Sequence, residues 1–194
     1  MFSMVKSAQL KRDILEIGWD VLAKEGREAL RMRDLAAKSG CAVGTLYNLF
    51  ENLEEIVLLL NGRYLDTLYS SLHCQMREGI ERKESLTVLL KRLGKTYFLF
   101  GMETPLVWKS LFENISMDGV PKWYREKVEQ GTLEIEKTLV KAYGLEKEKS
   151  RQLVHFFWAA MHGMTAIILN KKGEEMDLST LEAYMNQCLR GFIE

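Results

Sequence analysis

The sequence predicts an all-α protein of about nine helices, with a three-helix N-terminal domain and a larger helical C-terminal domain. Apolar residues recur with the 3.6-residue period of a helix along most of the chain, and no segment shows the alternating pattern of a strand. Only two prolines occur, and no Ser/Gly-rich tract interrupts the pattern. We therefore expect an ordered chain without flexible linkers.

Capping residues and apolar spacing place the helices in order along the chain. Gly26 caps the first helix, Gly40 lies in the turn that ends the second, and Asn52 with Glu55 forms a capping box at the start of the fourth. The expected helices span residues 7–25, 43–50, 52–77, 85–100, 105–114, 121–143, 153–169 and 179–192, with a further short helix that buries Met32, Leu35 and Ala36 and ends at Ser39-Gly40.

The composition excludes several classes of protein. The chain has 27 basic and 27 acidic side chains, so it is neither a histone-like polycation nor an acidic disordered tail. Its three cysteines are far apart and make no disulfide framework, which favours a reducing compartment. Charges at Lys6, Lys11 and Arg12 stand where a signal peptide needs an apolar core, so we expect a cytoplasmic protein.

Two short helices meet across a tight, glycine-containing turn in the N-terminal region. Their residues are Arg-Met-Arg-Asp-Leu-Ala at 31–36, Gly40, and Val-Gly-Thr-Leu-Tyr-Asn-Leu-Phe at 43–50. This pattern resembles the DNA-binding region of the TetR family of transcriptional regulators, and the resemblance spans roughly residues 7–60. It implies a helix-turn-helix DNA-binding domain at residues 1–52 and an effector-binding and dimerisation domain at residues 53–194.

The second of these short helices is the expected recognition helix. A helix of this size fits the major groove, and Gly44 allows its backbone to approach DNA closely. The resemblance implies that Thr45 and Tyr47 bind phosphates, while Ala42, Val43 and Asn48 lie nearest the base edges. Two arginines at the start of the preceding helix add positive charge. The expected DNA-binding residues are Arg31, Arg33, Ala42, Val43, Gly44, Thr45, Tyr47 and Asn48.

The sequence departs from the family pattern at two positions. Arg31 stands where members commonly carry a threonine, and Leu53 stands where a lysine usually follows the recognition helix. Residues 51, 54 and 55 beside Leu53 are all glutamates. The missing lysine removes a phosphate contact, which lowers both DNA affinity and its salt dependence. The sequence leaves open whether Leu53 weakens or abolishes DNA binding.

The segment at residues 153–169 is apolar on nearly all sides and needs cover on two faces. Its length is at the lower limit for a membrane span, but two histidines within it disfavour that interpretation. A twofold subunit interface supplies the cover when this helix pairs with the final one, and the resemblance implies the same homodimer. The expected interface residues are Phe157, Ala160, Met164, Ile167, Leu181, Met185 and Leu189.

The middle helices are rich in aromatic residues, which are typical both of a core and of a small-molecule cavity. In the family this region forms the effector pocket. The expected pocket residues are Tyr64, Leu68, Tyr97, Phe98, Trp108, Phe112, Trp123, Trp158 and His162. The effector would be a mostly apolar or aromatic small molecule. Neither His155 nor His162 has a carboxylate three or four residues away, so we expect no metal site and no cofactor.

Three functions remain after these observations. The favoured one is a dimeric transcriptional regulator, most simply a repressor released from a double-stranded DNA operator by its effector. The second is an architectural DNA-binding protein of the same fold without an effector. The third is a helical-bundle enzyme, which is disfavoured because the sequence offers no spaced set of catalytic residues.

Overall fold

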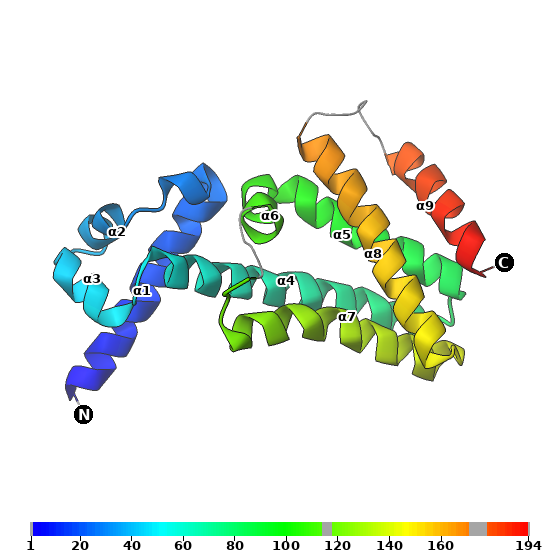
Figure 1. Ribbon diagram of the computed structural model, residues 1–194, viewed down its shortest axis with the longest axis horizontal. Helices are drawn as coiled ribbons and strands as arrows, with labels where there is room; N and C mark the ends of the chain where they lie inside the picture. The colour runs from blue at the N-terminus through cyan, green and yellow to red at the C-terminus, as the bar shows by residue number, and fades with distance from the viewer. Residues whose placement is uncertain (1, 114–117, 171–177, 194) are drawn as a thin grey trace. The chain divides into compact units, whose positions relative to one another are not determined.

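The structure confirms the all-α fold. It is a computed structural model that describes residues 2–113, 118–170 and 178–193, with the backbone alone for residues 2–5, 178 and 191–193. The predicted end of one helix at residue 114 lies outside the described residues. The helices, shown in Figure 1, are α1 (Phe2–Glu25), η1 (Arg27–Ala29, a short 3-10 helix), α2 (Met32–Lys38), α3 (Val43–Leu49), α4 (Leu53–Glu81), α5 (Leu86–Glu103), α6 (Pro105–Phe112), α7 (Lys122–Tyr143), α8 (Lys147–Leu169) and α9 (Leu178–Ile193).

The predicted capping box at the start of α4 is present. The Oδ1 atom of Asn52 accepts a hydrogen bond from the Glu55 amide at 3.0 Å. The Glu55 carboxylate reaches back and accepts from the Glu51 amide at 2.7 Å. The first bond satisfies an amide of the first turn of α4, and the second ties Glu55 to the residue before Asn52, one position earlier than the N-cap amide of a standard capping box.

The start of α8 was predicted six residues too late. The helix begins at Lys147 rather than at residue 153, because its first two turns are charged and carry no apolar stripe. Ser150 is wholly buried in these turns, and its hydroxyl donates a hydrogen bond of 2.9 Å to the Glu136 carbonyl. A polar contact with α7 therefore fixes this part of the helix.

The chain folds into two compact units. Unit 1 comprises Met1–Leu65 and Thr104–Val120, and unit 2 comprises Asp66–Glu103 and Pro121–Glu194. Helix α4 contributes its first part to unit 1 and its remainder to unit 2. The functional boundary after residue 52 stays a prediction.

Unit 1 has its core where α1 packs against α2 and α6. Trp108 from α6 and Leu22 from α1 are wholly buried there. Asn61 and Ser110 form a reciprocal pair inside this core: the Asn61 side-chain amide donates to the Ser110 carbonyl at 3.1 Å, and the Ser110 hydroxyl donates to Asn61 Oδ1 at 2.9 Å. The pair joins the first part of α4 to α6 without leaving a buried polar group unsatisfied.

Unit 2 is built around α8, which packs against α5, α7 and α9. Figure 1 shows α8 and α9 side by side next to α5. Gly94 on α5 permits this close packing: a Cβ atom there would stand 2.8 Å from Met185 Sδ, 2.9 Å from Met161 Sδ and 2.9 Å from Phe157 Cζ. Three side chains from α8 and α9 therefore occupy the space that a larger residue would fill.

Among the described residues, α8 alone has the length and apolar composition of a membrane-crossing helix. These two properties are weak evidence, since core helices of soluble proteins share them. Leu153, Phe157 and Met161 of α8 are buried inside unit 2. One face of α8 is thus already covered by protein.

Candidate nucleic-acid interface

Helices α2 and α3 form the predicted helix-turn-helix in unit 1. Gly40 takes the left-handed conformation in the turn, with a φ of 69°. The Cys41 amide then donates to the Ala36 carbonyl at 3.0 Å, which closes the turn behind α2. Leu35 and Ala36 anchor α2 in the core of unit 1, and Leu46 anchors α3.

Helix α3 divides sharply between an anchor and an open face. Leu46 is wholly buried, whereas Tyr47 is 55% exposed. Gly44 and Asn48 are exposed on the same side as Tyr47. A Cβ atom added at Gly44 would meet nothing within 4 Å. The chain thus holds this helix firmly and leaves one polar, sterically open face to solvent.

The other predicted DNA-binding residues lie around this face. Ala42 is exposed in the residue before α3, while Val43 and Thr45 are half-buried in its first turn. Arg31 and Arg33 are exposed at the start of α2, and no carboxylate among the described residues lies within ion-pair distance of either guanidinium. The structure brings the predicted set together in one segment.

The glutamates next to Leu53 are largely engaged with cations of unit 1. Glu54 forms an ion pair with Arg27, with 2.5 Å between Arg27 Nη2 and Glu54 Oε2. Glu55 lies 3.5 Å from the Lys11 ammonium, which also stands 4.7 Å from the centre of the Phe50 ring. These pairs offset part of the negative charge that follows α3. Lys11 is therefore already paired within the chain.

The predicted dimer-interface residues differ in their burial within one chain. Phe157, Leu181, Met185 and Leu189 are buried inside a single chain, because α8 and α9 turn these side chains toward α5. Ile167 is 48% exposed, and Ala160 and Met164 are half-buried.

Another apolar stripe on α8 does face solvent. It consists of Phe156, Ala160, Gly163 and Ile167, which follow one another at helical spacing, and we call it the α8 outer stripe. Phe156 is 44% exposed, and a Cβ atom at Gly163 would meet nothing within 4 Å. The sequence analysis missed Phe156 because an all-round apolar helix does not indicate which of its faces is the inner one.

The predicted aromatic pocket residues are distributed over both units. In unit 1, Trp108 packs in the core beside Phe112, and Tyr64 stacks on Trp19 with ring centroids 3.7 Å apart. Leu68, Tyr97 and Phe98 are buried in unit 2, and Trp158 is 42% exposed on α8. Most of the set therefore forms core contacts, as aromatic residues at helical spacing commonly do.

The histidines of α8 have hydrogen-bond partners from other helices. His162 Nδ1 lies 2.8 Å from the Tyr97 hydroxyl, and the Trp158 ring packs over the His162 ring with centroids 5.1 Å apart. His155 Nε2 lies 3.1 Å from a carboxylate oxygen of Glu136. Each histidine is a structural polar residue joined to a neighbouring helix.

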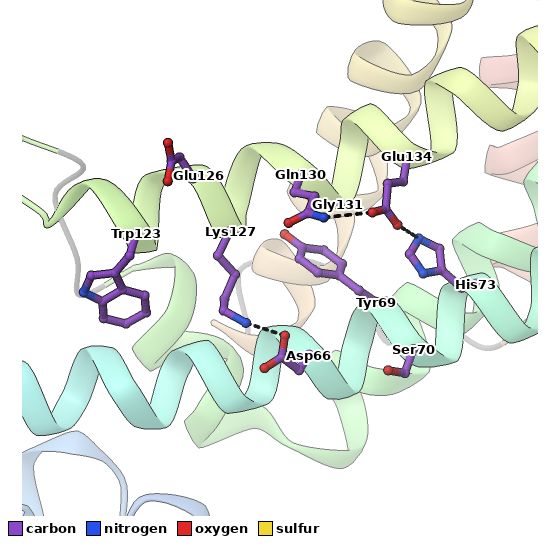
Figure 2. Close-up of a pocket in the computed structure, with 10 residues that line it drawn as sticks. All are labelled: Asp66, Tyr69, Ser70, His73, Trp123, Glu126, Lys127, Gln130, Gly131 and Glu134. Atoms are coloured by element: carbon purple, nitrogen blue, oxygen red, sulfur yellow. Dashed lines mark hydrogen bonds and ion pairs between the residues drawn. The ribbon is translucent and has the colours of Figure 1, made fainter.

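A groove of about 480 Å³ separates α4 and α7 within unit 2, and of the predicted pocket residues it includes Trp123. Figure 2 shows the helices joined across it by an ion pair between Asp66 and Lys127 and by a 3.0 Å contact between His73 Nε2 and the Glu134 carboxylate. The paired residues increase in number together, so the two helices run parallel. These residues escaped the sequence analysis, although complementary polar residues recur at matching spacing in 66–73 and 127–134.

Tyr69 fills the centre of the same helix pair. Its hydroxyl donates to the Val128 carbonyl at 3.1 Å, and its ring lies against Gly131 (Figure 2). A Cβ atom at Gly131 would stand 2.2 Å from ring atoms of Tyr69, so only glycine fits there. Burial raises the pKa of the Tyr69 phenol well above its ordinary value. This contact fixes α4 against α7.

Comparisons with known proteins agree with the helix-turn-helix geometry. Residues 14–60 match the family described as bacterial regulatory proteins, tetR family. The chain is 25% identical over 189 residues to an uncharacterized HTH-type transcriptional regulator of Mycobacterium tuberculosis, covering 97% of this chain and 83% of that protein.

Solved structures share the fold over nearly the whole chain. A protein of unknown function from Rhodococcus sp. RHA1 superposes with a TM-score of 0.79 at 16% identity, covering 95% of this chain and 96% of that one. A TetR-family protein from Vibrio parahaemolyticus superposes with a TM-score of 0.62 at 17% identity, covering 92% and 96%. These comparisons agree with the open face of α3: residues 14–60 form a DNA-binding domain of the tetR family, and the chain as a whole shares its fold with a TetR-family transcriptional regulator.

Proposed function

We propose that the protein is a cytoplasmic, homodimeric repressor that binds its operator through α3 and leaves it when a small, mostly apolar or aromatic effector binds. The observation that carries this proposal is the division of α3 between the buried Leu46 and the open face of Gly44, Tyr47 and Asn48. A monomeric fold gains nothing from an exposed tyrosine next to an empty glycine position. The major groove of DNA would supply contacts to this exposed face.

The residues of this face divide between backbone and base contacts. The hydroxyls of Thr45 and Tyr47 bind phosphates, which positions α3 on the duplex. Asn48, Ala42 and Val43 lie at the base edges, where an asparagine can bind adenine through two hydrogen bonds. Sequence preference therefore resides mainly in Asn48 and affinity mainly in Tyr47.

Electrostatic attraction comes from Arg31 and Arg33, which have no ion-pair partner among the described residues. Because Leu53 supplies no phosphate contact, we expect a shallower salt dependence than a lysine at this position would give. The ion pairs of Glu54 and Glu55 limit the repulsion that these carboxylates would exert on DNA.

Dimerisation through the α8 outer stripe would give the protein two copies of α3. Burial of exposed apolar side chains such as Phe156 and Ile167 by a second copy lowers the free energy and so favours the dimer. Gly163 allows the two α8 helices to approach closely. A twofold dimer matches two operator half-sites about 34 Å apart.

Release by an effector requires only that the effector binds one conformation better than the other. Helix α4 is the element that can transmit the choice, because it belongs to both units. Its unit 2 part is held on α7 by Tyr69, by the Asp66–Lys127 ion pair and by the contact of His73 with Glu134. An effector that changes the packing of α4 in unit 2 would change the conformation of a helix that continues into unit 1.

Fluorescence anisotropy with DNA flanking the protein's own gene tests the proposal, at two salt concentrations. We expect tight, salt-sensitive binding by the wild type and about tenfold weaker binding by Tyr47→Ala. Tyr47→Phe keeps the ring and removes the phosphate-binding hydroxyl. The DNA affinity lost in this variant therefore measures the contribution of the hydroxyl. Tyr184→Ala removes an equally exposed tyrosine from α9 and is the matched control.

Sedimentation analysis of the same variants shows whether the dimer persists. Wild-type affinity in Tyr47→Ala would contradict the assignment of α3 as the DNA-binding helix. Failure of the wild type to bind both the flanking DNA and a random-sequence pool would overturn the proposal as a whole.

A further inference from the structure

A second groove of unit 2 lies along one face of α5 and has a volume of about 570 Å³. This volume lies within the range of about 300 to 1,000 Å³ that is usual for small-molecule sites. Gln75 of α4 and Glu182 and Met185 of α9 line it together with α5. The α5 residues share one face at helical spacing: Val88, Lys91, Arg92, Lys95, Thr96 and Leu99.

The structure holds the borders of this α5 groove in place. Met185 is buried against Gly94, so α9 is fixed close to α5. Arg92 donates to Gln75 at 3.1 Å and forms an ion pair with Glu84. That hydrogen-bonded pair lowers the pKa of the Glu84 carboxyl. The Arg92 guanidinium is thereby paired within the chain, and it positions this part of α5.

The two lysines of the groove differ from Arg92 in their interactions. No carboxylate among the described residues lies within ion-pair distance of the ammonium group of Lys91 or Lys95. The two are four residues apart, so they lie one above the other on α5. Their mutual repulsion is relieved when an anion binds between them. Glu182 is the one acidic side chain that lines the groove in the described part of the chain.

Apolar surface adjoins these lysines. Val88 is 43% exposed one turn before Lys91, and Leu99 follows one turn after Lys95. The groove therefore combines positive charge at its middle with apolar contacts beside it.

We propose that the α5 groove binds a small amphiphilic anion, an alkyl or aryl group that ends in a carboxylate or a phosphate. Lys91 and Lys95 pair with the anionic head, and Val88 and Leu99 contact the apolar body. This site is separate from the DNA-binding face of α3. Its occupancy can therefore be measured without DNA, and the proposal does not rest on the repressor proposed above.

Isothermal titration calorimetry of the full-length protein tests the preference for an anionic head group with four ligands that have the same alkyl chain length. Octanoate and octyl phosphate carry the anionic head, while octanol and octylammonium have a neutral and a cationic one. We expect saturable binding of at least one anion, with octanol and octylammonium at least tenfold weaker (about 1.4 kcal/mol). The comparison of octanoate with octyl phosphate distinguishes a carboxylate site from a phosphate site. Equal binding of octanol, or no saturable binding of either anion, would overturn the proposal.

Substitution of the lysines tests the location. Lys91→Gln and Lys95→Gln remove the charge and keep most of the side chain, and both sites are near the surface, so the fold should tolerate them. We expect each to weaken anion binding by up to about fivefold, and the double variant by about tenfold. Lys137→Gln, an exposed lysine on α7 outside the groove, is the matched control and should bind as the wild type does. Wild-type affinity in the double variant would place the anion elsewhere.

Discussion

Gly44 on α3 in unit 1 and Gly131 on α7 in unit 2 are both helical glycines, and they differ in what faces them. The missing Cβ of Gly44 faces open space, with no atom within 4 Å. The missing Cβ of Gly131 faces the Tyr69 ring, whose atoms would stand 2.2 Å from it. A glycine costs helix stability at either place, so each position needs a compensating reason.

The reason at Gly131 lies inside the chain. Tyr69 occupies the space, and its hydroxyl bonds to the backbone of α7. Nothing in the described chain occupies the space at Gly44, which supports the proposal that this face of α3 approaches DNA. The comparison separates residues that serve the fold from residues that serve binding. It predicts that substitutions at the two glycines have opposite consequences.

Gly131→Ala should have the largest effect on stability. The added methyl group overlaps the Tyr69 ring and forces α4 and α7 apart, which we expect to cost about 2 kcal/mol of unfolding free energy even after the helix-propensity gain. Urea unfolding followed by circular dichroism measures this change.

A double-mutant cycle identifies the cause of that loss. In a Tyr69→Ala background the space is empty, so adding Gly131→Ala should be neutral or should stabilise the helix by up to about 1 kcal/mol. An equal loss in both backgrounds would show that the Tyr69 contact is not what requires glycine at 131.

Gly44→Ala should act on binding and not on stability. Alanine favours the helix and meets no atom of the chain, so the melting temperature should stay equal or rise. The methyl group would hold α3 away from the major groove, and we expect operator affinity to fall about tenfold. Anisotropy and thermal unfolding of one preparation measure both quantities. A loss of stability at unchanged affinity would make Gly44 a residue of the fold.

The part of the fold that sequence could predict is the part encoded locally. Helical spacing, the Asn52 cap and the glycine turn gave the all-α class and the order of the helices, because these signals depend on neighbouring residues alone. The polar start of α8 was missed, since its anchor, Ser150, bonds to Glu136 on another helix. Such a contact leaves no mark in the local pattern.

The same distinction explains the candidate sites. The predicted residues around Gly44 lie on one short segment, so their sequence neighbourhood brought them together. Phe157 and Leu189 were assigned to a subunit interface and are buried in one chain, because periodicity shows that a helix has apolar faces but not which one its own neighbours cover. The α4–α7 groove joins residues from distant segments and required the tertiary structure.

Tyr69→Phe should give the smallest effect, and it separates the hydroxyl from the ring. The variant keeps the ring against Gly131 and loses the hydrogen bond to the Val128 carbonyl, which should cost about 1 kcal/mol near neutral pH. Because the folded pKa of Tyr69 is raised, its contribution is fully present below the unfolded value of about 10 and is lost as the pH rises toward the folded value. The wild type should therefore lose stability more steeply than Tyr69→Phe above about pH 10.

Urea unfolding at neutral and alkaline pH measures both slopes. Tyr184→Phe, which removes an exposed hydroxyl, is the control and should keep the wild-type slope. Parallel slopes for the wild type and Tyr69→Phe would mean that the phenol does not titrate with unfolding, and the ring alone would then account for the contact with Gly131.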